Sequence, residues 1–274
     1  MSIRTGIFLA MLVLAVVATL LFLLAPIAAL LLQVPLRDLP GLLRETAVTS
    51  ALLVSLKTNL IANVIILVVG TPAAYLLALG RFRGRPALLT LLELPLVLPP
   101  AVAGIALLTA FGAFGLFGSA LASVGVFLPF TQAAVVIAVT FVAGPYYVRA
   151  AVAAFATVDR DQLDAARDLG AGEGTVFRRI ALPLAADGLR AGWALAFARG
   201  IGEFGATLLF AGSVERITET LPLAVYAQLD VNLDSAVAVG ILLLAISGGV
   251  LLVAKLPPLW SPGAPSRSTP AGGW

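Results

Sequence analysis

The sequence predicts an all-α protein, a polytopic bundle of transmembrane helices with about six spans, and three observations lead to this class. Of the 274 residues, 61% are hydrophobic and only 11% are charged, whereas soluble domains carry about a quarter charged residues. The apolar residues gather into stretches that approach the roughly 20 residues a helix needs to cross a bilayer. The short alternating segments typical of membrane β-strands are absent from the sequence, so the spans are expected to be helices.

Each expected span is an apolar stretch bounded by polar or turn-forming residues. In chain order the stretches are Gly6–Leu32, Thr58–Leu79, Leu88–Ala110, Gln132–Ala154, Leu189–Ala211 and Ala236–Ala254. The first stretch is about twice as long as the 7–15-residue apolar core of a signal peptide, so we expect an uncleaved span. In the third stretch, Pro95, Pro99 and Pro100 remove backbone donors and are expected to kink or interrupt the helix.

The connections divide the chain into three parts. Residues 1–50 hold the first span and an external loop, residues 51–254 form the main membrane domain, and residues 255–274 form a tail rich in Pro, Ser and Gly that we expect to be disordered. The external segment Gly112–Phe130 carries no charge. We therefore expect it to pack against the bundle or to re-enter the membrane.

The basic residues predict the orientation. With the N-terminus in the cytoplasm, 12 of the 17 Lys and Arg residues fall on the inner side of the membrane, as the positive-inside rule requires. Both termini are then cytoplasmic, and the protein is expected in the cytoplasmic (inner) membrane. The basic pI of about 9.7 reflects this topology, so no nucleic-acid partner is expected.

The sequence contains no His and no Cys. This excludes His-ligated metal sites, Ser-His and Cys-His nucleophile pairs and disulfides, so no catalytic and no metal-binding residue is expected. The only lysines are Lys57 and Lys255, and neither lies in a phosphate-binding loop. Any ATP hydrolysis must therefore take place on another chain.

The most polar segment is a cytoplasmic loop at residues 155–187. Asp159 can cap a short helix, with Gln162 completing a capping-box pattern, and Gly170 stands where a helix end favours positive φ. A second short helix is expected to start at Thr175 and to end at Pro183. The apolar faces of the two helices suit docking in a partner's groove. The alternative is that the loop is a solvated connector that makes no contacts. The apolar face of the first helix consists of Leu163, Ala166 and Leu169.

The same loop resembles the EAA loop of permease subunits of bacterial ABC importers. That motif reads Glu-Ala-Ala, three residues, Gly, nine residues, Ile, one residue and Leu-Pro, and this chain keeps every spacing with Asp in place of the first Glu. The resemblance implies a coupling helix seated in a groove of a cytoplasmic ATPase. The matching residues are Asp164, Ala165, Ala166, Gly170, Ile180, Leu182 and Pro183.

Two further segments narrow the resemblance to the molybdate, tungstate and sulfate permeases, and most closely to the molybdate branch. Leu94–Gly104 is similar to their third-span signature, and Phe197–Thr207 to their fifth-span signature, Phe-Ala-Arg-x-x-Gly-Glu-Phe-Gly-Ala; Gly200 stands where a larger residue is usual. The resemblance implies the type I importer permease fold and import of a tetrahedral oxyanion, molybdate or tungstate, by alternating access. Sulfate or thiosulfate is the alternative cargo.

The resemblance also implies partners. They are a second copy of the chain in a homodimer, a cytoplasmic ABC ATPase dimer that holds ATP and Mg²⁺, and an extracytoplasmic oxyanion-binding protein, all around a lipid bilayer. The chain itself is expected to bind no cofactor.

Polar residues within the membrane supply the pathway candidates. Arg199 and Glu203 can form an i, i+4 pair, which either helps to set a gate or only neutralises itself. A stripe of small residues, Ala194, Ala198, Gly202 and Ala206, permits close helix approach and could line the pathway or a dimer axis, or serve ordinary packing within the chain. The candidate residues are Arg199, Gly202, Glu203, Gly205, Thr207 and Pro99.

Two other classes remain open from the residues alone. An ion-coupled secondary transporter would need carboxylates within the membrane, and Glu93 and Glu203 are the candidates. A membrane-embedded enzyme would have to work without His or Cys. Neither class accounts for the spacing of the EAA-like loop.

Overall fold

The computed structural model describes residues 3–256, which form helices and connecting turns without a strand in that range. The helices are α1 (Ile3–Gln33), α2 (Leu39–Leu42), α3 (Thr46–Leu79), α4 (Arg85–Val97), α5 (Pro100–Phe111), α6 (Gly118–Ser123), α7 (Gln132–Ala156), α8 (Arg160–Asp168), α9 (Glu173–Val176), the π-helix η1 (Phe177–Ala181), α10 (Leu182–Ile201), α11 (Gly205–Ala211), α12 (Leu221–Gln228) and α13 (Leu233–Lys255). The tail predicted to be disordered falls almost wholly at 257–274, outside the described residues.

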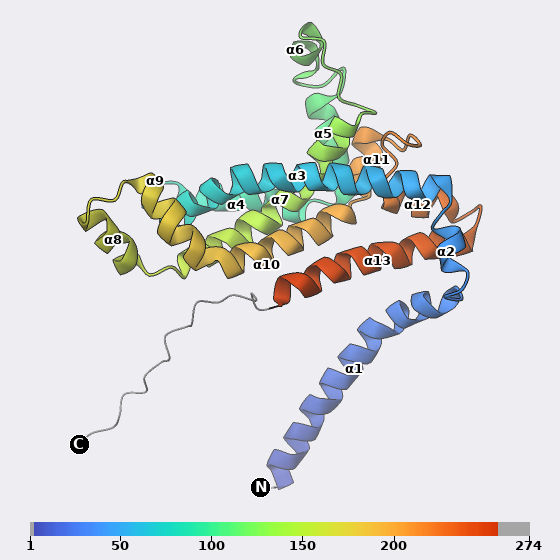
Figure 1. Ribbon diagram of the computed structural model, residues 1–274, viewed down its shortest axis with the longest axis horizontal. Coiled ribbons are helices and arrows are strands. Elements are labelled where there is room, and N and C mark those ends of the chain that lie inside the picture. The colour runs from blue at the N-terminus through green and yellow to red at the C-terminus, as the bar shows by residue number, and fades with distance from the viewer. Residues whose placement is uncertain (1–2, 257–274) are drawn as a thin grey trace.

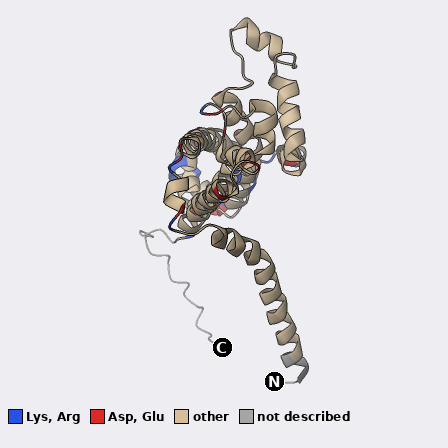
Figure 2. Ribbon diagram, turned by 90° about the vertical axis from the view of Figure 1, so that its right-hand side faces the viewer, with Lys and Arg blue, Asp and Glu red and all other residues tan. Residues whose placement is uncertain are grey.

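The long helices α3, α7, α10 and α13 run side by side and form the bundle (Figure 1). The core lies where α3 and α10 pack against α7, with Tyr147 and Phe155 of α7 fully buried. The helices α8 and α9 lie at one end of the bundle, and α2 and α12 lie at the other end. Viewed along the bundle, most of the ribbon is free of charged residues (Figure 2), as a surface in contact with lipid requires.

The six predicted spans are confirmed in number. Five helical runs are long and apolar enough to cross a membrane, and the bent pair α4–α5 supplies a sixth. The second span begins at Thr46 rather than at the predicted Thr58. Hydroxyl side chains lower the hydropathy of the first turns, which hid them from the prediction, but these hydroxyl groups form hydrogen bonds within their own helix and do not interrupt it. Thr58 Oγ1, for example, donates to the Val54 carbonyl at 2.7 Å.

The third span is interrupted, as its prolines predict. Helix α4 ends at Val97, α5 begins at Pro100, and the two are bent by 112°. Pro99 and Pro100 cannot donate backbone hydrogen bonds to the preceding turn, so the helix cannot continue through them.

The segment between α5 and α7 packs against the rest of the protein in part. Leu128 is partly buried against the core, and Phe117 stacks on Phe111 of α5 with ring centroids 5.6 Å apart; re-entry of Gly112–Phe130 into the membrane stays a prediction. Helix α6 projects away from the long helices (Figure 1), and the side chains of Phe114 and Phe127 are exposed. Its contacts are mainly with α5.

The fifth span departs from the prediction at both ends. Helical structure runs without interruption from Glu173 through η1 to Ile201, and it then breaks before α11. The predicted span Leu189–Ala211 therefore joins parts of two helices, and the small-residue stripe that it carried is divided. Ala194 and Ala198 lie in α10, Gly202 lies in the break, and Ala206 lies in α11.

Candidate functional site: the coupling loop and the helix break

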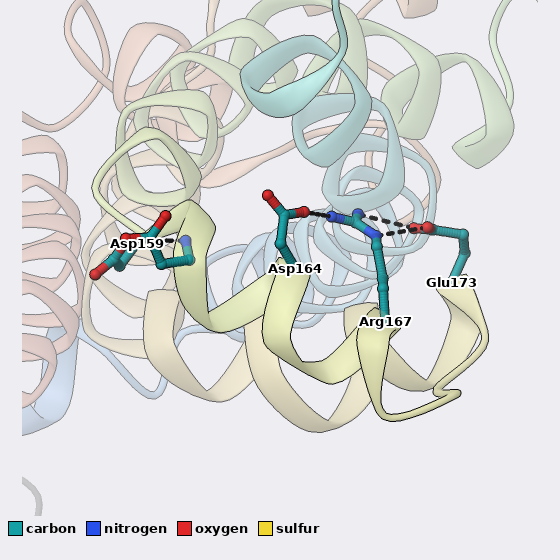
Figure 3. Close-up of polar contacts among 5 residues, drawn as sticks. Asp159, Asp164, Arg167 and Glu173 are labelled. Carbon is teal, nitrogen blue, oxygen red and sulfur yellow. Dashed lines mark hydrogen bonds and ion pairs between the residues drawn. The ribbon is translucent and has the colours of Figure 1, made fainter.

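The first helix of the coupling loop, residues 155–187, is capped at both ends by its own sequence. Asp159 Oδ1 accepts a hydrogen bond from the Asp161 backbone N–H at 3.0 Å (Figure 3), as the capping pattern predicts. At the other end Gly170 has φ +85°, and the Ala171 N–H bonds back to the Ala166 carbonyl at 3.0 Å. This is a Schellman turn, and glycine takes its positive φ without strain.

Arg167 ties the two helices of the loop together across the glycine turn. Its Nη1 lies 2.6 Å from Asp164 Oδ1, and its Nε and Nη2 lie 2.7 and 3.0 Å from the two carboxylate oxygens of Glu173 (Figure 3). The fork of two parallel bonds to Glu173 fixes direction as well as distance. These carboxylates raise the pKa of Arg167 above its ordinary value, so the guanidinium stays charged.

The sequence reasoning missed Arg167. The i, i+3 spacing of Asp164 and Arg167 on one helix could have suggested the first contact. The contact of Arg167 with Glu173 depends on how the turn between them folds, so their spacing in the sequence does not predict it.

An aromatic cluster anchors the loop to the membrane helices. Tyr75 of α3 packs against Phe155 of α7 and Phe177 of η1, with ring centroids 5.4 and 4.8 Å apart. Edge-on and tilted aromatic contacts of this kind add to the burial of their surface. The base of the loop is therefore packed against two long helices of the bundle.

Pro183 does not end the second helix, so this boundary was predicted wrongly, as was the start at Thr175. The helix begins at Glu173 and passes through the π-turn Phe177–Ala181 into α10. Pro183 has no N–H to donate to the carbonyl four residues earlier. A wider π-turn directly before it accommodates the ring without ending the helix.

The motif residues of the loop divide into two groups by burial. Asp164, Ala165, Gly170 and Pro183 are exposed, while Ala166, Ile180 and Leu182 are partly buried and pack against the core. Leu169, which the sequence placed on the same apolar face as Leu163, is 90% exposed, whereas Leu163 is 2% exposed. The loop thus presents a small surface with one large apolar side chain at its tip.

The second part of the site is the helix break, Gly202–Phe204, where Glu203 links the two helices. Its Oε1 accepts the Ala206 N–H of α11 at 2.8 Å, and its Oε2 lies 2.7 Å from Arg199 Nη1 of α10. The predicted ion pair is therefore present. The Glu203 side chain is 1% exposed and that of Arg199 is 26% exposed, so the accessible charge at the break is positive.

The two interrupted helices meet at this place. A Cβ at Gly205 would lie 2.7 Å from Pro100 Cβ, and a Cβ at Gly104 would lie 2.8 Å from Leu209 Cβ. Such distances are too short for real carbon atoms, so α5 and α11 pack with their backbones in close contact. The predicted candidates therefore gather around one junction: Pro99 precedes α5, Gly205 begins α11, and the side chain of Thr207 in α11 is fully buried.

Comparison with known proteins agrees with this architecture. Residues 66–254 match the family described as the binding-protein-dependent transport system inner membrane component. The chain is 43% identical to the molybdenum transport system permease protein of Mycobacterium tuberculosis over 236 residues, 86% of this chain and 89% of that protein. It is 40% identical to a probable molybdenum ABC transporter permease of Haloferax volcanii, over 85% of this chain and 84% of that one.

More distant relatives extend the comparison. A sulfate transport system permease protein of Salmonella typhimurium is 32% identical, over 83% of each chain. A chain of a bacterial alginate ABC transporter superposes with a TM-score of 0.74 at 16% identity, over 92% of this chain and 93% of that one. A chain of the MetNI methionine ABC transporter gives a TM-score of 0.59 at 18% identity, over 76% of this chain and 93% of that one.

The fold and the matched relatives define a multi-pass inner-membrane permease subunit of an ABC importer. The chain belongs to the family of inner membrane components of binding-protein-dependent transport systems. This assignment replaces the alternative of an ion-coupled secondary transporter.

Proposed function

We propose that this chain is the membrane permease of an importer for molybdate, driven by ATP hydrolysis on a separate subunit. The observation that carries the proposal is the 43% identity with a molybdenum permease along nearly the whole membrane domain. The spacing of the coupling loop, which matches that of the EAA motif, and the preformed, exposed surface of the loop support the ATP-driven mechanism. Tungstate has nearly the same size and charge as molybdate and is an expected second cargo.

In this proposal the coupling loop docks in a groove of the cytoplasmic ATPase. Asp164, Ala165 and Gly170 form the contact surface, and the exposed Leu169 inserts as its apolar anchor. Small residues at Ala165 and Gly170 permit close approach of the partner. The uninterrupted helical run Glu173–Ile201 then carries displacements of the loop to the helix break.

The chemistry of ATP belongs to the partner. The chain has two lysines and no phosphate-binding loop, so ATP and Mg²⁺ are assigned to an ABC ATPase dimer, and the permease is assigned neither catalysis nor a cofactor. The end of the bundle that bears α8 and α9 is then cytoplasmic, as are both termini. A binding protein delivers the oxyanion at the opposite end, and a second copy of the chain completes the pathway.

The pathway is proposed to pass the helix break. Arg199 keeps its charge partly accessible while Glu203 neutralises it from a buried position, so a passing anion is attracted without being held tightly. Pro99, Gly202, Gly205 and Thr207 surround the junction of the four helix ends. Movement of α5 and α11 there would open and close the path by alternating access.

The direct test uses the permease reconstituted in liposomes with its ATPase and binding protein. We expect ATP-dependent uptake of labelled molybdate that excess tungstate inhibits, and no uptake by the permease alone. Preference for sulfate over molybdate would favour the second candidate cargo, which the 32% identity with a sulfate permease supports. Uptake by the permease alone would overturn the ATP-driven mechanism.

A further inference from the structure

A buried amide on α3 holds the last turn of α10. The Asn59 side chain is 1% exposed, and its Nδ2 donates to the Phe197 carbonyl at 3.2 Å. Lipid tails are as apolar as apolar side chains, so membrane helices are held together by close packing and by hydrogen bonds between them. A hydrogen bond to a backbone carbonyl fixes both the rotation and the axial position of the partner helix.

The orientation of this amide is itself fixed. Asn63, also 1% exposed, donates from Nδ2 to the Asn59 carbonyl at 2.9 Å and to Asn59 Oδ1 at 3.2 Å. Asn63 Nδ2 can only donate and the Phe197 carbonyl can only accept, so Asn59 must present its oxygen to the first and its nitrogen to the second. The two asparagines therefore form one directed chain of bonds from α3 to α10.

Gly200 makes room for this contact. A Cβ at Gly200 would overlap Asn59 Oδ1 and would lie 2.9 Å from Val139 Cγ1. A larger residue there would have to displace the Asn59 amide or move α10 away from α3, and either change would disturb the bond to Phe197. The glycine that departs from the usual fifth-span signature thus has a partner in Asn59.

The contact lies at a mechanically important place. Phe197 is one turn before the helix break, and Arg199 lies between them. The helical run Glu173–Ile201 meets α3 at both of its ends: Phe177 packs on Tyr75 beside the coupling loop, and Phe197 bonds Asn59 beside the break. In contrast, α11 beyond the break packs mainly on α5 and α7.

We propose that Asn59, oriented by Asn63, is a positioning residue for the transport cycle. Asn59 locks the end of α10 to α3, so a displacement of the coupling loop moves these two helices together. The displacement then bends the chain at the helix break and does not shift α10 along α3. Asn59 contacts no cargo in this role. The role in transport rests on the proposed function, whereas the lock itself is a property of this chain.

The lock is tested by distances within the assembled complex. The chain has no cysteine, so each copy of the chain carries spin labels only at Leu60→Cys in α3 and Leu195→Cys in α10, both exposed positions, and the distance followed is the one within a single copy. We expect the same label distance without nucleotide and with a trapped ATP analogue. A change in label distance of more than about 2 Å, the size of ordinary helix shifts, would overturn the proposal. This test needs no substitution at Asn59.

Variants then test the residue. Asn59→Ala and Asn59→Leu remove the donor and are expected to broaden the label distances. Thr58→Val is the matched control: Thr58 is equally buried, but its hydroxyl bonds only carbonyls of its own helix. A narrow distribution in Asn59→Ala, equal to that of the control, contradicts the proposal.

The ratio of oxyanion imported to ATP hydrolysed distinguishes a positioning role of Asn59 from a merely structural one. In the reconstituted complex, Asn59→Ala is expected to lower the oxyanion imported per ATP hydrolysed about fivefold or more, and Thr58→Val to stay within about twofold. Equal losses of uptake and ATP hydrolysis in Asn59→Ala would overturn the positioning role. If the unsubstituted complex imports no oxyanion, the proposed function fails, while the label distances still decide whether the lock exists.

Discussion

The coupling loop and the helix break are held by opposite kinds of contact. In the loop, Arg167 joins Asp164 and Glu173 through side chains that are between 36% and 70% exposed, and such pairs each contribute about 0–1 kcal/mol to stability. At the break, Gly104 and Gly205 bring two backbones so close that one added methyl group has no space. Substitution should therefore affect function in the loop and folding at the break.

The largest effect is expected where α5 meets α11. Gly104→Val places carbon atoms against Leu209 and the Ala206 backbone, and overpacking of this kind costs about 1–3 kcal/mol or more. We expect the yield of folded permease to fall severely, measured by size-exclusion chromatography in detergent. Gly248→Val is the control, because a Cβ at Gly248 meets nothing within 4 Å; similar losses in both variants would contradict the packing argument.

The next largest effect separates folding from coupling in the loop. Gly170→Arg forces a non-glycine residue into φ +85° at a cost of about 1–2 kcal/mol, but a Cβ there meets nothing within 4 Å. The permease should fold and reach the membrane, while uptake and stimulated ATP hydrolysis are lost. Undiminished ATP-driven uptake would refute the docking role of the loop, and Gly174→Arg in the same loop serves as the comparison.

A smaller effect is expected from the ion pair at the break. Glu203→Gln keeps an oxygen for the Ala206 N–H but leaves Arg199 without its countercharge. Because Arg199 is partly exposed, we expect a loss of stability of about 1–3 kcal/mol and a clear fall in uptake, measured by thermal unfolding and transport. Full stability and full uptake would show that the hydrogen bond alone, and not the pair, holds the break.

The smallest effect is expected at Arg167. Arg167→Gln removes exposed ion pairs and should lower the unfolding temperature little, since the pairs contribute about 1 kcal/mol or less each. It should nevertheless weaken binding of the ATPase, because the turn between α8 and α9 is no longer fixed before docking. Titration of the ATPase onto the purified permease measures this affinity, with Arg160→Gln as a control in the same helix. Equal affinities in both variants would contradict the role of Arg167 in fixing the loop before docking.

The features that the sequence predicted correctly are set by residues close together in the chain, and the features that it missed are set by contacts between distant segments. The cap at Asp159 and the turn at Gly170 were predictable because each is set by neighbours within a few residues. The course of the chain at Pro183 was not, because proline can either end a helix or be accommodated in it. The π-turn that accommodates Pro183 begins at Phe177, which packs against Tyr75, a residue far away in the sequence. The partner of Gly200 lies on α3, far away in the sequence.

The sequence by itself determined the membrane class, the number of spans and the loop that marks the family. These follow from hydropathy and from spacing along the chain. Only the tertiary structure decided that the fifth span breaks at Gly202–Phe204 beside the break in the third, and that Asn59 bonds the carbonyl of Phe197. In a chain this apolar, hydropathy tells which residues enter the membrane, but close backbone approach and buried hydrogen bonds between distant segments determine where its helices are held and where they break.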